Sequence, residues 1–457
     1  MNVDGSRLPG RAQRIAFGFM LAVSGISVAA GQERPVDSGQ EQPTDSTEQG
    51  VTDIDQTDFV GPQPEGLVAP EEQSPFIRDS RFSAQMRTFY FDRDKYDGSS
   101  SEAWTLGGSI TYRSGYLGDF LRFGATGYTS QPLWAPDDRD GTLLLKPGQE
   151  GYTVLGQLYG EVKFTDKIFG AMGAKAYNTP YINANDVRMT PNTFEGATVY
   201  GTAGGTDGAP DWKFGGGYID KIKQKNDDGF VSMSEAAGAS VDRGVFVGGA
   251  NMKQGDFSIG AAEYYSSDIL NIFYAESKFA LPVGDTHKLA FGAQFSDQRS
   301  TGDNLLTGQS FSGHQWGLKS DLNLGPALLT LAYTDTTDGT NMRNPWSGYP
   351  GYTSVQVKDF NRAGESAVLL RGAYDFSSHG AEGWSAYVLY VHGSGVHSPN
   401  YNEDETDFNL QWTPKGGALR GLSFRLRYAY IEQRGGGDPN INDLRFIVNY
   451  DFPRPGE

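Results

Sequence analysis

Side chains alternate between two characters in the segment from Leu422 to Tyr450, and this alternation limits what the chain can fold into. Residues 424–430 read Phe-Arg-Leu-Arg-Tyr-Ala-Tyr, with arginine at odd positions, and after a glycine-rich turn the pattern resumes around Arg445. Successive side chains of a β-strand face opposite sides. One face is therefore apolar and rimmed with tyrosine, and the other carries arginines. A soluble sandwich would bury the apolar face, whereas a membrane barrel turns it to lipid and the charged face to a water-filled lumen.

The same alternation of apolar and polar side chains recurs along the chain from Phe76 onward. Short alternating runs are separated by clusters of Gly, Asp, Asn and Pro, as expected of antiparallel strands and their turns. The runs are 82–91, 102–113, 120–129, 152–164, 168–177, 194–202, 212–223, 244–253, 257–265, 269–278, 287–297, 312–323, 327–336, 366–376, 384–393, 405–413, 422–432 and 442–451. Closed antiparallel outer-membrane barrels need an even number of strands. The sequence therefore predicts an all-β fold, a transmembrane antiparallel β-barrel of about 18 strands.

The connections between these runs alternate in length. Short turns such as 165–167, 254–256 and 325–326 join some pairs, and long segments such as 178–193 and 337–365 join others. Short periplasmic turns and long extracellular loops are typical of outer-membrane barrels. Aromatic residues gather at the ends of the runs, where interfacial girdles form.

The N-terminal part of the chain differs from the barrel region. Three arginines precede an apolar run, Ile15 to Ala30, which ends in small residues. This pattern predicts a cleaved export signal in residues 1–30; the alternative, a transmembrane helix, needs ~20 apolar residues. Residues 31–75 hold eleven acidic residues and one arginine. We expect them to form a disordered acidic arm, with a plug or a tether to peptidoglycan as alternatives, and 76–457 to form the barrel.

Other functional classes find little support in the composition. The chain has no cysteine, and its five histidines are scattered without the spacing of a metal site. No glycine-rich phosphate loop follows a strand, and the net charge of −18 does not favour nucleic acid. We therefore expect no cofactor, no metal, no nucleic-acid partner and no enzymatic activity.

Several segments share a distinctive pattern: the first strand around 86–94, the segment 185–196, the loop segments 345–353 and 359–365, and the closing strands with their arginines. These segments resemble the OprD family of outer-membrane porins. The resemblance implies an eighteen-stranded pore with the third loop folded into the lumen, for uptake of small, mostly carboxylate-bearing solutes. The chain departs from the family pattern in its long acidic arm and in placing Phe452 five residues before the C-terminus, where barrel proteins usually end on an apolar residue.

A selective pore needs a constriction and a field that favours one charge. Arginine suits a carboxylate because its planar guanidinium donates two hydrogen bonds at once. Strand parity turns Arg425, Arg427, Arg445 and Arg87 toward the lumen, and the first and last strands are neighbours when a barrel closes. We expect these four arginines to form a basic track on one wall; the alternative is that each is paired with an acid of the wall.

The loop 178–193 supplies the other predicted side of the constriction. We expect Asp186 and Arg188 to lie opposite the basic track, where an acid facing arginines gives a transverse field. The alternative is that these two residues pin the loop to the wall. Parity also turns four further residues inward as secondary candidates, Lys163, Lys175, Lys319 and Arg371.

These observations predict a porin of the bacterial outer membrane. It would let small water-soluble solutes diffuse passively and selectively through a basic-lined constriction, with amino acids or organic acids as the expected class. Its partners would be these solutes and outer-membrane lipid, and it would be a monomer or a loose trimer. The alternatives are a β-barrel enzyme, such as a lipid-active hydrolase, and a surface adhesin.

Overall fold

The computed structural model describes residues 74–205, 209–284, 286–397, 400–435 and 439–452. The predicted export signal and nearly all of the predicted acidic arm lie outside these residues. The described part begins with a short helix, α1 (Pro75–Arg78), which has proline at its first position and Ser74 at its N-cap. Proline suits that position because its fixed φ matches a helix and its missing N–H would be unpaired there anyway.

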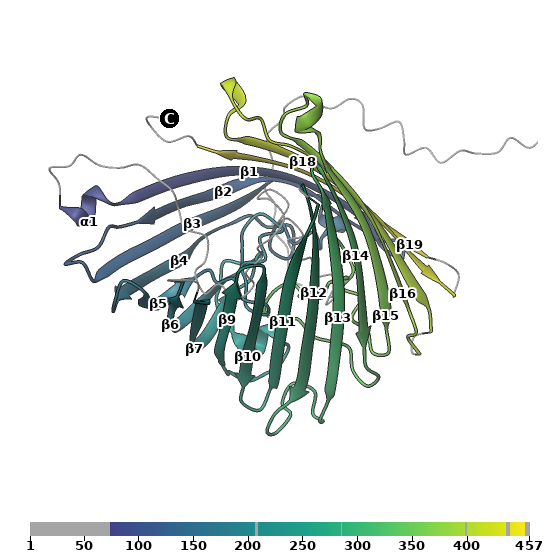
Figure 1. The fold of residues 1–457 in the computed structure, drawn as a ribbon, viewed down its shortest axis with the longest axis horizontal. Coiled ribbons are helices and arrows are strands. Elements are labelled where there is room, and N and C mark those ends of the chain that lie inside the picture. The colour runs from purple at the N-terminus through teal and green to yellow at the C-terminus, as the bar shows by residue number, and fades with distance from the viewer. Residues whose placement is uncertain (1–73, 206–208, 285, 398–399, 436–438, 453–457) are drawn as a thin grey trace, which may run out of the picture. The chain divides into compact units, whose positions relative to one another are not determined.

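The described residues form one antiparallel sheet that closes on itself (Figure 1). The sheet has nineteen strands, and β1 pairs with β19 to complete the ring. One of them, β8 (Val231–Ser232), is a two-residue strand inside a loop and pairs only with β7 among the described residues. The other eighteen strands form the barrel wall, so the predicted barrel of about 18 strands is confirmed.

Each predicted run corresponds to one wall strand. The wall strands are β1 (Arg81–Asp94), β2 (Ser100–Arg113), β3 (Leu121–Trp134), β4 (Tyr152–Lys163), β5 (Ile168–Lys175), β6 (Thr193–Gly204), β7 (Asp211–Lys223), β9 (Val245–Gln254), β10 (Phe257–Ser266), β11 (Leu270–Val283), β12 (His287–Ser300), β13 (Ser312–Leu324), β14 (Ala327–Thr336), β15 (Ser366–Asp375), β16 (Trp384–Ser394), β17 (Asn402–Trp412), β18 (Leu422–Arg434) and β19 (Asn440–Asp451). The short helical turns are α2 (Met233–Ala236), η1 (Asp137–Arg139), η2 (Phe376–His379) and η3 (Gly417–Leu419). No helix among the described residues is long and apolar enough to cross a membrane.

The two faces of the wall differ sharply in exposure. On β18, Leu426, Tyr428 and Tyr430 are exposed on the outer face, whereas Arg427 is buried on the inner face. The outer face also carries aromatic stacks near one end of the barrel, where Trp412 lies 5.4 Å from Trp384 and 5.3 Å from Phe424, ring centre to ring centre. An apolar outer face with aromatic residues at its edge is the surface that lipid requires.

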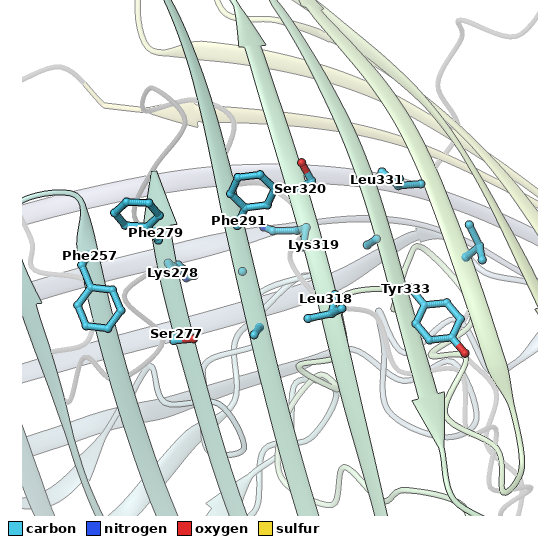
Figure 2. A pocket seen from close by; sticks show the side chains of 14 residues that line it. Phe257, Ser277, Lys278, Phe279, Phe291, Leu318, Lys319, Ser320, Leu331 and Tyr333 are labelled. Carbon is cyan, nitrogen blue, oxygen red and sulfur yellow. The ribbon is translucent and has the colours of Figure 1, made fainter. Parts of the chain in front are cut away.

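A shallow groove of about 490 Å³ interrupts this apolar face over β11 to β15. Small side chains at Ser277 and Ala293 leave it open, and outward-facing rings such as Phe279 and Phe291 border it (Figure 2). Strand parity places these four residues on the outer face, because exposed Phe279 and Phe291 share it with Ser277 and Ala293. The groove therefore faces lipid and does not belong to a solute path through the lumen.

The connections at the two ends of the barrel differ in length. One end, called the turn end here, carries turns such as 164–167, 255–256 and 325–326, together with both ends of the barrel's chain path, Arg81 and Asp451. The other, the loop end, carries the long segments. It also carries short connections such as 95–99 and 267–269, so the predicted alternation is less regular than expected. Short turns place the turn end on the periplasmic side.

Adjacent residues on β13 test the orientation of the wall. Leu318 lies mid-strand and is 53 % exposed on the outer face, and Lys319 is its inward neighbour. We expect Leu318→Arg to lower the free energy of unfolding from lipid vesicles by about 2–4 kcal/mol, because the charge enters hydrocarbon. The control Lys319→Arg should leave it within about 0.5 kcal/mol. Equal losses for both variants, measured by denaturant titration, would contradict this orientation.

Candidate functional site

Loop L3 (residues 176–192) crosses the lumen from one wall to the opposite one. At one place Asp186 contacts Arg87 of β1. At another, the Tyr181 ring packs edge-on against Tyr264 of β10 and Tyr274 of β11, and its hydroxyl is 2.6 Å from Ser296 Oγ of β12. Eight wall strands separate β1 from β11 in either direction around the ring. L3 is therefore folded into the lumen, as the family resemblance implies, and it narrows the pore.

Arg87 fastens L3 to the closing strands. Its Nη1 donates to Asp186 Oδ1 at 2.7 Å and its Nη2 donates to Asp186 Oδ2 at 3.1 Å, which makes a two-bond ion pair. Nη1 also donates to the carbonyl of Arg188 at 2.5 Å, and Nε donates to Asn449 Oδ1 of β19 at 2.7 Å. Asp186 thus lies against a member of the predicted basic track. The expectation that it faces the track from the opposite side is wrong, and the contact matches the loop-pinning alternative.

Arg188 points away from Asp186 and into the protein. Its Nε donates to the carbonyl of Thr142 at 2.8 Å, and its guanidinium carbon lies 5.0 Å from the ring centre of Phe91. The residue is 1 % exposed. Arg188 therefore joins L3 to the loop 135–151 and adds positive charge near the wall. The expectation that Arg188 lines the opening opposite the basic track is wrong.

Loop L7 (residues 337–365) is held in the lumen by carboxylates of the wall. Glu405 of β17 accepts from the backbone N–H groups of Val357 and Lys358, both at 2.8 Å. Asp407, two residues along the same strand, accepts from the N–H of Gln356 at 3.1 Å. These bonds satisfy backbone donors that would otherwise be buried without a partner.

The side chain of Gln356 completes this carboxylate clamp. Its Nε2 donates to Asp443 Oδ1 of β19 at 2.7 Å, and the backbone carbonyl of Gln356 accepts from Arg445 Nη2 at 3.5 Å. Glu405, Asp407 and Asp443 are each no more than 1 % exposed. L7 is therefore fastened to β17 and β19, beside the strands that carry the arginines.

The four track arginines lie on the inner face of three neighbouring strands. Arg427 and Arg445 are direct partners across β18 and β19, and Arg425 lies two residues from Arg427 toward the turn end. Asn409 Oδ1 of β17 accepts from Arg425 Nε at 2.6 Å and orients that guanidinium. Arg427, Arg445 and Arg87 are 3 %, 0 % and 9 % exposed, whereas Arg425 is partly exposed. Solutes in the lumen thus reach Arg425 more readily than the other three.

The ring of Phe91 lies against two wall arginines and one arginine of L3. The guanidinium carbons of Arg93, Arg188 and Arg445 lie 5.2, 5.0 and 5.1 Å from its centre. Asp443 is bonded to both Arg93, at 2.6 Å, and Arg445, at 2.7 Å. Three cations therefore share one aromatic ring, and two of them also share one carboxylate, which concentrates positive charge behind L3 and L7.

The secondary candidates occupy separate places on the inner face. Lys175 lies 3.9 Å from Glu161 and donates to Tyr200 Oη, and Lys163 is paired with Asp166 at the turn end. Lys319 is paired with Asp321 on the same strand and lies over Tyr352, and Arg371 lies 4.3 Å from the ring centre of Tyr387. They lie on β4, β5, β13 and β15, whereas the track arginines lie on β1, β18 and β19, so the structure does not group them with the track.

Sequence reasoning missed the residues that hold the loops and orient the arginines. They are Glu405, Asp407, Asp443, Gln356, Asn409 and Asn449. A signal was present for five of them, because parity turns Glu405, Asp407 and Asn409 of β17 to the lumen, and it turns Asp443 and Asn449 of β19 the same way as Arg445. No such pattern marks Gln356, because its position in a loop gives no parity.

A buried acid in L7 titrates unusually. Asp359 accepts from Ser354 Oγ at 2.6 Å and from Asn344 Nδ2 at 3.0 Å. Burial raises the pKa of the Asp359 carboxyl from 3.8 to about 7, although the bond from Ser354 and the charges of Lys225 and Lys358 act in the opposite direction. The carboxyl therefore becomes charged in its buried place near neutral pH.

A comparison with known protein families decides the identity of this barrel. Residues 74–454 match the profile of the outer membrane porin, OprD family. The chain belongs to the OprD family. Over 425 residues it is 26 % identical to Porin D of Pseudomonas aeruginosa, and the match covers 83 % of this chain and 92 % of that protein. The chain is therefore an outer-membrane protein, as predicted.

Solved structures share the fold of this OprD-family chain. OccK9 (OpdG) of Pseudomonas aeruginosa superposes with a TM-score of 0.74 at 22 % identity, covering 83 % of this chain and 100 % of that one. OccAB3 of Acinetobacter baumannii gives 0.74 at 20 % identity, with 82 % and 100 % covered. OpdK of Pseudomonas aeruginosa, solved with vanillate, gives 0.70 at 20 % identity, with 82 % and 99 % covered.

These relatives are porins, so the barrel-enzyme and adhesin alternatives are not favoured. The relatives pass small solutes through the outer membrane, which matches the coarse function predicted from the sequence. No group of three or more His, Asp or Glu side chains in the described part of the chain is placed to hold a metal ion.

The Arg87–Asp186 pair predicts how L3 is held in this OprD-family pore. We expect Arg87→Gln and Asp186→Asn each to lower the free energy of unfolding, with a coupling energy of about 1 kcal/mol in a double-mutant cycle. The coupling stays modest because the Asp186 side chain is 44 % exposed and solvent screens the pair. Both variants should also increase single-channel current noise as L3 loosens. If the two substitutions lower the free energy of unfolding additively in the double variant, the Arg87–Asp186 pair does not hold the loop.

The pKa of Asp359 predicts a pH dependence of L7. Because the pKa is higher in the folded loop than in an unfolded chain, the protonated carboxyl stabilises the packed loop fully below about pH 4. This stabilisation is lost as the pH rises through about 7. We expect hydrogen exchange of the L7 amides to accelerate between about pH 5 and pH 8, after correction for intrinsic rates. Asp359→Asn should remove that dependence, and an unchanged pH profile in the variant would refute the assignment.

Proposed function

We propose that this OprD-family porin lets small, carboxylate-bearing solutes diffuse passively through the gap that L3 and L7 leave beside β18, β19 and β1. Amino acids and organic acids belong to this class. The observation that carries the proposal is the row of inward arginines on these three neighbouring strands, Arg87, Arg425, Arg427 and Arg445. A cation path would need a comparable row of acids facing the lumen. In this wall, Asp407 and Glu405 are bonded to L7, and Asp443 is bonded to Arg445.

The track arginines differ in how they can act on a solute, because their side chains differ in exposure. Arg425 is partly exposed and its plane is oriented by Asn409, so its guanidinium can attract a carboxylate that passes through the lumen. Arg427 and Arg445 are buried, so they act on a solute through their field and not by direct contact. A positive field in a narrow lumen raises the local concentration of anions. Weak, repeated attraction of this kind favours entry without holding the solute.

Asp186 adds a negative group beside the track arginines. Its carboxylate is bonded to Arg87, and its side chain remains 44 % exposed. OpdK was solved with vanillate, an aromatic carboxylate, which supports the proposed class of solute.

Reversal potentials in planar bilayers test this proposal. We expect Arg425→Gln to lower the ratio of anion to cation permeability by roughly two- to fivefold, because one lumen charge is worth about 0.5–1 kcal/mol to a nearby ion. The matched control is Arg299→Gln, which removes the same charge from the outer face, where Arg299 is bonded to Asp297.

The control separates a lumen effect from a change in net charge. It should leave the permeability ratio within about a tenth of the wild-type value, since the wall and lipid separate Arg299 from the lumen. If Arg425→Gln and Arg299→Gln behave alike, or if the wild-type channel prefers cations, the proposed anion preference is wrong.

A further inference from the structure

Arg343 lies in L7, on the loop-end side of the place where L3 contacts β12. The hydroxyl of the L3 residue Tyr181 is 2.6 Å from Ser296 Oγ of that strand. Gln298 is two residues nearer the loop end of β12, and its side chain is bonded to the backbone of Arg343. A solute that enters through the loop end therefore reaches the level of Arg343 before it reaches the L3 contact.

Two hydrogen bonds and one aromatic ring fix the position of Arg343. Its backbone N–H donates to Gln298 Oε1 at 2.7 Å, and its carbonyl accepts from Gln298 Nε2 at 2.6 Å. Its guanidinium carbon lies 4.8 Å from the ring centre of Phe311, in the segment that leads into β13. The ring attracts the cation, and the residue stays partly exposed. A side chain held in this way loses little freedom when it binds an anion.

Arg343 differs from other loop-end arginines because it forms no ion pair within the described part of the chain. Its buried Nε has no hydrogen-bond partner among these residues. Burial lowers the pKa of the Arg343 guanidinium, and no described carboxylate acts in the opposite direction. Arginine still keeps its charge near neutral pH. Other loop-end arginines have acidic partners: Arg139 with Glu102, Arg243 with Asp268, Arg362 with Glu365 and Arg434 with Asp404.

We propose that Arg343 binds solute carboxylates at the external mouth of the pore and raises the rate at which they enter. One charge of this kind raises the local concentration of anions roughly two- to fivefold. Such weak attraction lets an anion leave Arg343 and move on toward the track arginines. The class of solute rests on the function proposed above, whereas the position and the partners of Arg343 are independent of it.

Currents through oriented single channels test this role. The chain has no cysteine, so Ser240→Cys, at an exposed position of the loop before β9, can carry a biotin label that marks the loop end. The measured quantity is a current ratio in symmetrical potassium acetate. It divides the current at the voltage that drives acetate in from the loop end by the current at the opposite voltage.

We expect Arg343→Gln to lower this ratio roughly 1.5- to 3-fold in about 0.05 M salt, because acetate no longer gathers at the loop end. In about 1 M salt, where charges are screened beyond ~3 Å, the ratio should match that of the wild type. Heat-modifiable migration checks that each variant is folded.

Two control variants separate the lumen charge of Arg343 from other effects. Arg343→Lys keeps the charge and should keep the ratio within about a fifth of the wild-type value. Arg299→Gln removes a charge at the same level of β12, since Arg299 follows Gln298, but on the outer face. It should produce less than about a third of the effect of Arg343→Gln, because the wall separates it from the lumen.

Three results would overturn the proposal: an unchanged ratio in Arg343→Gln at low salt, an equal change in Arg299→Gln, and a loss in Arg343→Lys as large as that in Arg343→Gln. The proposed function is judged separately by adding Arg425→Gln to the Arg343→Gln channel. If this addition leaves the permeability ratio unchanged while Arg343→Gln alone alters the acetate current ratio, the proposed role of the track is wrong and the role of Arg343 stands.

Discussion

Backbone hydrogen bonding in hydrocarbon is the constraint on which the rest of this structure depends. A strand in lipid cannot leave its N–H and C=O groups unpaired, so the sheet has to close. The β1–β19 pairing completes this closure over ten residue pairs, from Gln85 with Asp451 to Asp94 with Asn442. The same β1–β19 pairing brings Arg87 beside Asn449, and it places β18 and β19 on the same side of the barrel as β1. The basic track exists as a surface only because the barrel closes there.

The same constraint explains the acids of the inner wall. Two loops enter a lumen bordered by buried side chains, and their backbone donors need partners. Glu405 and Asp407 accept from three consecutive N–H groups of L7, residues 356–358. Asp443 serves both Gln356 and the arginines Arg93 and Arg445. The wall therefore carries acids and bases in adjacent rows, and the acids fix the loop while they also offset repulsion among the arginines.

Much of the wall could be predicted from the sequence because lipid and water sort side chains with a period of two. The eighteen runs match eighteen strands, and parity placed Arg427 and Arg445 on the inner face. The loops escaped prediction because their contacts join distant positions with no periodic signal. Asp186 meets Arg87 across 99 residues, and Gln356 meets Asp443 across 87. Arg188 shows the same limit: its sequence neighbours suggest a polar loop, yet it is 1 % exposed against Phe91.

Most track arginines are buried, so they can act on a solute only through the electric field that they and their neighbouring acids produce. A buried guanidinium is costly unless its charge is matched, and Asp443 matches the charge of Arg445 at 2.7 Å. Asp443 cancels part of the charge of Arg445. The electric field in the lumen is therefore set by the net charge of arginines and acids together, and not by the number of arginines. Arg425 differs from Arg445 because it is partly exposed and its Nε is bonded to a neutral asparagine. The proposed selectivity would therefore depend more on which cations have acidic neighbours than on how many cations the wall contains.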